Sequence, residues 1–230
     1  MYSTLLINNV LADVFFYKWK NSMASYTHIE NRFHSLSDHV SFFNPDVLLL
    51  QEFSRQELFP RFIDESKWDV YHNCKSGRSP GQAVLLNPTL WANSSVIATF
   101  RSGANGFVAV KTTSQCGKVL GFISIHGKYG DTSRLVEEHV ELFISHHQDI
   151  PWIAAGDFNK EIDAVSIAGL KRVPIDSPTH LSNTEHGNFI VTYDHVFVSP
   201  CLYDSLEKSM CLVQTFCCAM EIIVCTKHTT

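Results

Sequence analysis

The apolar residues of this chain follow two patterns, one typical of buried strands and one typical of amphipathic helices. Residues 47–52 (VLLLQE) and 150–155 (IPWIAA) are nearly continuous apolar runs, as expected for strands that are buried on both faces. Between residues 28 and 43, apolar side chains instead recur every three or four positions. This spacing predicts an amphipathic helix that stops before Pro45.

Residues 132–147 form the second predicted helix, and Thr132 or Ser133 could cap its first turn. The side chains expected to share one face of this helix are Leu135, His139, Leu142 and Phe143. The other apolar runs are short and are separated by Gly, Pro and Asn residues, which predicts strands joined by turns. These strands are placed at residues 4–10, 68–72, 82–86, 95–100, 107–113, 119–126, 189–198 and 219–225, with a short helix at 55–65.

The order of these elements favours one architecture. Several strands follow one another in the middle of the chain, and the helices lie near the ends of the pattern. The expected fold class is therefore α/β, with two packed sheets covered by helices rather than one doubly wound parallel sheet. The length of 230 residues fits one core and no linker marks a boundary, so residues 1–230 are expected to form a single domain.

Composition and charge exclude some classes of protein. A net charge of −5 argues against a protein that coats long duplex nucleic acid through many phosphate contacts. A nuclease stays compatible, because a bound divalent cation reverses the local charge of a site. We find no signal peptide and no apolar run as long as a membrane span. The sequence does not indicate an oligomeric state.

The cysteines bear on the compartment in which the protein works. The chain has seven of them, and five lie in the last thirty residues without the spacing of a zinc framework. We interpret them as free thiols of an intracellular protein in a reducing compartment, either the cytoplasm or the nucleus. A disulfide-stapled C-terminal region is the alternative.

Polar side chains follow the two most apolar predicted strands. Glu52 ends VLLLQE, where a carboxylate is held by a rigid element and could bind a metal, although a surface glutamate at a strand end fits equally well. Asp157 and Asn159 follow IPWIAA within the motif GDFN. Because they are two residues apart, they point the same way on an extended backbone, and one could accept a proton while the other donates to phosphate or water. An Asx-type turn is the alternative.

Four further residues are candidates for chemistry or for packing. Asp194 interrupts an otherwise apolar strand, and a buried carboxylate requires a partner such as a histidine or a metal. Its neighbour His195 alternates to the other face and is expected to be structural. His126 ends the predicted strand GFISIH and is either a site residue or a surface histidine that opens a turn. His228 is a candidate only because it accompanies the other signals.

Taken in order, these motifs resemble those of the endonuclease/exonuclease/phosphatase superfamily. The matching stretches are residues 7–13, 44–52, 123–129, 154–159, 177–199 and 226–228, which together span almost the whole chain. The opening Asn-Val-Leu-Ala-Asp looks most like the deadenylase and phosphodiesterase branch. The resemblance implies the DNase I-like fold, a two-sheet α/β sandwich flanked by helices. It also implies a Mg²⁺-dependent phosphodiesterase, with Mn²⁺ as an alternative metal.

The resemblance also implies roles for individual residues. Glu52 would be the principal metal ligand with Asn9 beside it, and His126 and Asn159 would contact the phosphate. Asp157 would orient or deprotonate the attacking water. The pair of residues expected to stabilise the charge of the transition state is Asp194 and His228.

The C-terminal motif departs from the family pattern. The family ends in Ser-Asp-His followed by a closing strand, whereas this chain has Thr226-Lys227-His228 and stops at Thr230, so the fold is expected with or without its last strand.

Three functions stay open. The first is a nuclease acting on RNA or DNA, whose bases could stack on aromatic residues such as Phe53, Tyr129, Phe158 and Tyr193 unless these belong to the core. The second is hydrolysis of a small phosphoester or lipid headgroup, and the third is a degenerate, non-catalytic binding module.

Overall fold

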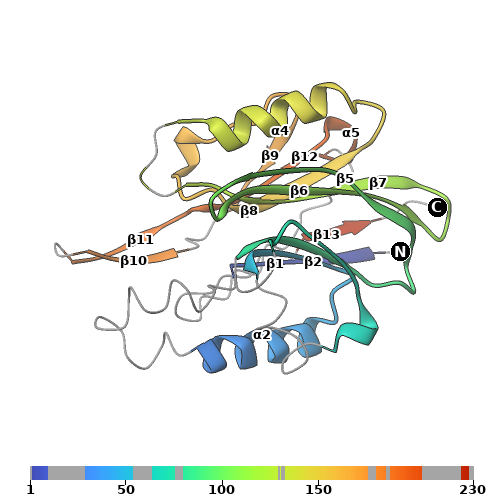
Figure 1. Ribbon diagram of the computed structural model, residues 1–230, viewed down its shortest axis with the longest axis horizontal. Coiled ribbons are helices and arrows are strands. Elements are labelled where there is room, and N and C mark those ends of the chain that lie inside the picture. Colours follow the sequence, from blue (N-terminus) through green and yellow to red (C-terminus); the bar gives the residue numbers. More distant parts are fainter. Residues whose placement is uncertain are drawn as a thin grey trace.

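The computed structural model describes residues 2–9, 29–53, 64–75, 80–128, 130, 133–175, 180–184, 187–203 and 224–227. Their strands form two main sheets that pack face to face, with a helix on the outer side of each (Figure 1). The predicted two-sheet α/β sandwich is therefore confirmed. None of the helices in the described part of the chain is long and apolar enough to cross a membrane.

The first sheet has the strand order β13-β1-β2-β4-β3. Its strands are β1 (Tyr2–Asn9), β2 (Val47–Phe53), β3 (Asp69–His72), β4 (Gly81–Leu86) and β13 (Val224–Lys227). The strands β1 and β2 run parallel, and the other neighbours are antiparallel. Of the strand predicted at 219–225, residues 224 and 225 belong to β13, which lies beside β1, and residues 219–223 fall outside the described residues.

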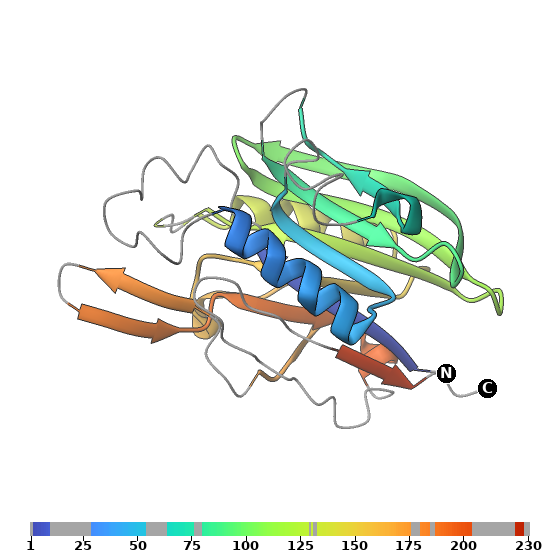
Figure 2. The ribbon, with the colours of Figure 1, turned by 90° about the horizontal axis from the view of Figure 1, so that it is seen from below.

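The second sheet has the strand order β5-β6-β7-β8-β12-β9. Its strands are β5 (Trp91–Ser102), β6 (Asn105–Ser114), β7 (Val119–His126), β8 (Trp152–Asp157), β9 (Lys171–Val173) and β12 (Asp194–Val198). Only β7 and β8 run parallel within this sheet. The single strand predicted at 189–198 is instead two strands, because the chain leaves the hairpin of β10 (His180–Thr184) and β11 (Gly187–Val191) before β12 begins. This hairpin projects from the sandwich (Figure 2).

Apolar side chains form three clusters, one between the sheets and one between each sheet and its outer helix. Between the sheets lie residues such as Leu49, Val84, Phe122 and Val196. Below the first sheet, α2 (Ile29–Phe43) contributes Leu36 to a second cluster. The 28–43 helix prediction is thus confirmed, whereas residues 55–63 of the helix predicted at 55–65 lie outside the described residues. Three short helices complete the described fold, namely the 3₁₀ helices at Glu65–Lys67 and Ile162–Ala164 and α5 at Pro200–Tyr203.

The second predicted helix forms as α4 (Leu135–Ser145), but its buried face differs from the expected set. Leu135 and Leu142 are 41% and 60% exposed. The residues buried against the second sheet are Val136, Val140, Phe143 and Ile144, which follow the spacing of a regular helical stripe. Ser133 does not cap the first turn, because Arg134 occupies the N-cap position and makes no side-chain capping bond. The other candidate cap, Thr132, lies outside the described residues.

Candidate active site

Three predicted site residues form one row across the second sheet. His126 at the end of β7 lies directly opposite Asp157 at the end of β8, and Asp157 lies directly opposite Asp194 at the start of β12. Residues in register on neighbouring strands project to the same face of a sheet. Ala155 and Val196, two residues away along β8 and β12, belong to the layer between the sheets, so the row faces the first sheet. All three side chains are buried.

Glu52 reaches this row from the first sheet through an irregularity in β2. Leu49 packs between the sheets and Leu50 packs toward α2, so a regular strand would point Glu52 away from the second sheet. Instead, the register with β4 shifts between Leu50 and Phe53, and Glu52 has a φ of 51°. This bulge places Glu52 Oε1 3.5 Å from His126 Nε2. A left-handed backbone at a non-glycine residue costs energy, and such strain gathers at functional sites.

Asn159 lies beyond the end of β8 and also has a left-handed backbone, with a φ of 52°. Its backbone N–H donates to Asp157 Oδ1 at 2.8 Å, which is the Asx-type turn considered from the sequence. Its side-chain Nδ2 donates to the carbonyl of Gly127 at 3.1 Å and lies 3.2 Å from His126 Nε2. The expectation of an extended backbone from 157 to 159 is therefore wrong, because the turn itself directs the Asn159 amide back to His126.

Two glycines allow the site strands and loops to approach closely. A Cβ on Gly156 would lie 2.0 Å from the carbonyl oxygen of Ile125, and a Cβ on Gly127 would lie 2.1 Å from that of Phe158. Below the row, Gln51 Nε2 donates to Ser124 Oγ at 3.0 Å, and Ser124 Oγ donates to the Leu50 carbonyl at 2.9 Å. These buried bonds join β2 to β7 next to Glu52 and His126.

The hydrogen bonds of His126 define its tautomer. Its Nδ1 lies 3.3 Å from the carbonyl oxygen of Ala104, which can only accept, so Nδ1 carries the hydrogen. The other ring nitrogen, Nε2, lies 3.5 Å from Glu52 Oε1 and 3.2 Å from Asn159 Nδ2. Ala104 belongs to the turn between β5 and β6, and no motif in the sequence marked this segment as part of the site.

His195 lies on the opposite face of β12 from Asp194, as strand alternation predicts. Its Nε2 donates to the carbonyl of Lys160 at 2.8 Å, and its ring packs near the rings of Phe158 and Phe197. Burial lowers the pKa of His195, so its neutral form is favoured. These contacts hold the turn that follows Asp157.

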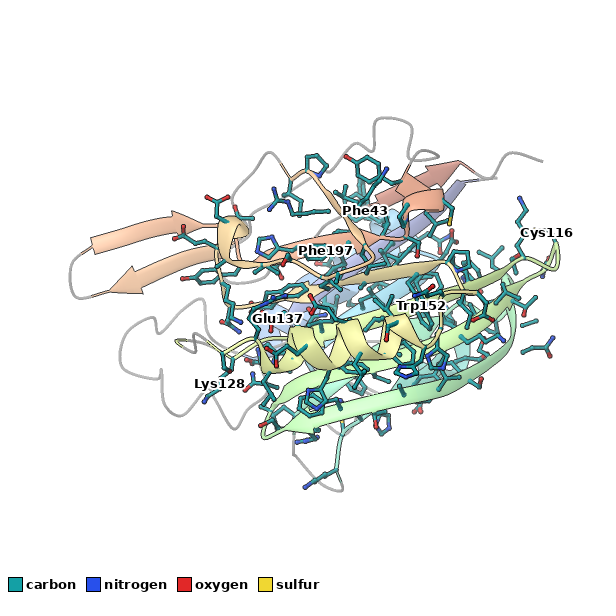
Figure 3. All side chains as sticks on the ribbon, turned by 90° about the horizontal axis from the view of Figure 1, so that it is seen from above. Phe43, Cys116, Lys128, Glu137, Trp152 and Phe197 are labelled. Carbon is teal, nitrogen blue, oxygen red and sulfur yellow. The ribbon has the colours of Figure 1, made fainter. Side chains whose placement is uncertain are left out.

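Lys160 links the same turn to α4. Its Nζ lies 2.5 Å from Glu137 Oε1 and donates to the Ser133 carbonyl at 2.7 Å. Glu137 and Lys128 lie at one end of the sandwich, whereas Cys116 lies at the other (Figure 3). The row of site residues, the GDFN turn and the start of α4 therefore belong to one connected region.

The remaining predicted residues are placed less completely. Asn9 pairs with Gln51 in the β1–β2 ladder, so its backbone adjoins the Glu52 bulge, while its side chain and all of His228 lie outside the described residues. Phe53 and Phe158 are 0% and 1% exposed, so for these two the core alternative holds and stacking on bases is excluded. Tyr129 is outside the described residues, and Tyr193 is half-buried.

The donor set suits a hard divalent cation. Asp157 and Asp194 lie directly opposite each other in the β8–β12 ladder, and Glu52 reaches the same row from the first sheet. Carboxylate and amide oxygens are the ligands that Mg²⁺ uses, and Mg²⁺ is held by only one or two carboxylates in many enzymes. Among the described residues, no group of three or more His, Cys, Asp or Glu side chains has the geometry to enclose a metal on its own.

The fold and the row of polar residues together define a DNase I-like sandwich. Residues 16–205 match the model of the Endonuclease/Exonuclease/phosphatase family. The chain therefore belongs to this family, as the motifs in its sequence indicate. The family name covers nucleases and phosphatases, which are both phosphoric ester hydrolases. No curated protein matches the sequence.

Several solved structures share the fold. TDP2 of D. rerio, complexed with single strand DNA product, is 14% identical over 98% of this chain and 100% of that one, with a TM-score of 0.68. The endonuclease domain of TRAS1, a telomere-specific non-LTR retrotransposon, is 12% identical over 99% of this chain and 100% of that one, with a TM-score of 0.69. ANGEL2, a 2′,3′-cyclic phosphatase, is 14% identical over 87% of this chain and 83% of that one, with a TM-score of 0.67.

Proposed function

We propose that this protein is a Mg²⁺-dependent phosphodiesterase, with Mn²⁺ as an alternative metal, and that it hydrolyses RNA or DNA. One observation carries the proposal. Glu52 from the first sheet converges with His126, Asp157 and Asn159 from the second, and two of these four residues hold a strained backbone to do so. The roles of all four are part of the proposal.

The residues of the chain would divide the chemistry as follows. Glu52, with Asn9 beside it, would hold the metal, which when bound supplies charge neutralisation at the non-bridging phosphate oxygens. Asp157 would take the proton of the attacking water, because the Asn159 N–H fixes the orientation of its carboxylate. His126 and the Asn159 amide would bind the phosphate.

Asp194 would act on the other side of Asp157. It lies opposite Asp157 across the β8–β12 ladder, and it is proposed to orient His228, whose imidazolium would stabilise the charge that develops on the phosphate. Lys227 lies in β13, at the position where the family pattern has an aspartate. A lysine there could take over part of the metal's attraction for phosphate.

Single-stranded nucleic acid, or the ends of duplexes, is the proposed substrate. The net charge of −5 disfavours extended contact with duplex phosphates, and the similar fold of TDP2 is known with a single strand DNA product. The likeness to the phosphatase ANGEL2 favours a small phosphoester as the second candidate. We also propose a reducing compartment, because Cys74 and Cys116 are free thiols.

A cleavage screen tests the proposal. Labelled single-stranded RNA, single-stranded DNA, duplex DNA and 2′,3′-cyclic nucleotides would be incubated with the protein in Mg²⁺, Mn²⁺ or EDTA. Asp157→Asn should abolish turnover, whereas Asp163→Asn, at an exposed aspartate a few residues further along, should not change it. Binding without turnover of any substrate would favour the non-catalytic module, and full activity of Asp157→Asn would refute the proposed role of Asp157.

A further inference from the structure

The turn between β5 and β6 contacts the candidate site through residues that no motif had indicated. Two consecutive residues are involved, Ala104 of the turn and Asn105, the first residue of β6. The Ala104 carbonyl oxygen lies 3.3 Å from His126 Nδ1. Asn105 Nδ2 donates to the Gly127 carbonyl at 2.7 Å, and Gly127 directly follows His126.

Asn105 and Asn159 share one acceptor. The Gly127 carbonyl that accepts from Asn105 also accepts from Asn159 Nδ2 at 3.1 Å. The Asn159 amide has two N–H groups, and its other contact is His126 Nε2 at 3.2 Å. The position of the Gly127 carbonyl therefore influences how the Asn159 amide is aimed, and Asn105 holds that carbonyl with the shorter of the two hydrogen bonds.

The turn is itself held by the first sheet. Gln82 of β4 is fully buried, and its Nε2 donates to the Ala104 carbonyl at 2.8 Å. Asn73 fixes this glutamine by donating from Nδ2 to Gln82 Oε1 at 2.7 Å and accepting the Gln82 N–H at Oδ1 at 2.8 Å. Asn73 Nδ2 also lies 3.0 Å from the carbonyl of Phe107 on β6. These bonds lock the β5–β6 turn of one sheet to the other sheet.

We propose that Asn105 and Gln82 are positioning residues of this site, an inference that rests on the proposed function. Gln82 fixes the Ala104 carbonyl, which accepts from His126 Nδ1 and so orients the ring. Asn105 fixes the Gly127 carbonyl, which accepts from Asn159 Nδ2 and so orients that amide. Together they keep the two proposed phosphate-binding groups in one geometry by holding the carbonyls to which these groups donate.

The variant Asn105→Asp tests this role with little change in volume. A carboxylate cannot donate to the Gly127 carbonyl, and it repels that oxygen. We expect kcat to fall about tenfold or more, the size expected for a lost buried hydrogen bond and its repulsion, while KM changes less than about twofold. Asn105→Ala, which removes the donor without the repulsion, should lie between wild type and Asn105→Asp. The control is Asn87→Asp, because Asn87 uses its Oδ1 only as an acceptor for Thr89.

Nuclear magnetic resonance separates a failure of this inference from a failure of the proposed function, since it needs no turnover. In ¹⁵N-labelled wild-type protein, His126 should carry a hydrogen on Nδ1. Asn105→Asp should shift the side-chain amide signals of Asn159, Asn87→Asp should leave them unchanged, and Gln82→Met should add the Nε2–H tautomer at His126. An Nε2–H tautomer in the wild type, or unchanged Asn159 signals in Asn105→Asp, would overturn the inference whether or not the protein cleaves any substrate. Unchanged kcat in Asn105→Asp would overturn it in an active enzyme.

Discussion

Gly156 precedes the proposed catalytic Asp157, and the structure leaves no room for a side chain there. Its φ is 149°, and an added Cβ would lie 2.0 Å from the Ile125 carbonyl oxygen and 2.9 Å from Gln51 Nε2. The Ile125 oxygen belongs to the neighbouring strand, so relief requires a backbone shift. Overpacking of this kind costs about 1–3 kcal/mol, and the backbone strain adds about 1–3 kcal/mol. Gly156→Ala should therefore destabilise the protein by roughly 2–6 kcal/mol.

The assay compares thermal unfolding by circular dichroism with that of Gly117→Ala. Gly117 also has a positive φ, of 80°, but nothing lies within 4 Å of its added Cβ, so this control carries the backbone strain alone. For a chain of this length, each kcal/mol lowers Tm by roughly 2–4 °C, so Gly156→Ala should lose roughly 2–12 °C more than Gly117→Ala, the difference due to overpacking. Turnover measured below both midpoints should also fall in Gly156→Ala, because the shift displaces Asp157. Equal losses in Tm for the two variants would refute the argument from close approach.

Three further predictions concern groups near the site and at the far end of the sandwich. Lys160→Met should lower the free energy of unfolding in urea by about 3–5 kcal/mol, because it leaves the Glu137 carboxylate, which is 2% exposed, without its cation. Adding Glu137→Gln should recover part of this stability, and no recovery would contradict the argument. Because burial lowers the pKa of His195 in the folded state, the unfolded chain binds more protons and stability should fall as the pH drops below about 6.5. His195→Gln should make that fall in Tm shallower, and an unchanged slope would show that other groups cause it. Iodoacetamide at pH 8 should modify Cys116 well before Cys74, as followed by peptide mass spectrometry. A hydrogen bond with Ser114 lowers the pKa of the exposed Cys116 thiol, whereas burial raises the pKa of the Cys74 thiol to about 11. Equal rates of modification at the two thiols would contradict this.

The sequence predicted those parts of the fold that depend on local patterns. The apolar runs that end at Glu52 and at Asp157 became buried strands, because a continuous apolar run is stable only where both faces are covered. The strand that contains Asp194 was predicted too long, because apolar runs lie on both sides of Thr192 and Tyr193, the two residues that separate β11 from β12. The exposed face of α4 was assigned wrongly at Leu142, because two apolar stripes compete along that helix and only packing decides between them.

The candidate site was predictable by residue type but not by geometry. Alternation along β2 would direct Glu52 away from His126, and only the bulge reverses this direction. Asn159 reaches His126 through a turn with a positive φ, which no apolar pattern encodes. Gln82 and Asn105 act through contacts between segments distant in sequence, so a local pattern could not have identified them.

The most direct test of the proposed metal-dependent site is a Mg²⁺ titration of turnover for wild type and Glu52→Gln, on whichever substrate the cleavage screen identifies. Glu161→Gln, at an exposed glutamate, serves as the matched control. We predict no turnover in EDTA. The half-saturating Mg²⁺ concentration should rise at least about tenfold in Glu52→Gln, because Glu52 would be the principal carboxylate ligand, and it should stay unchanged in Glu161→Gln. Turnover that persists in EDTA, or a titration of Glu52→Gln that overlays that of the wild type, would contradict the proposed site.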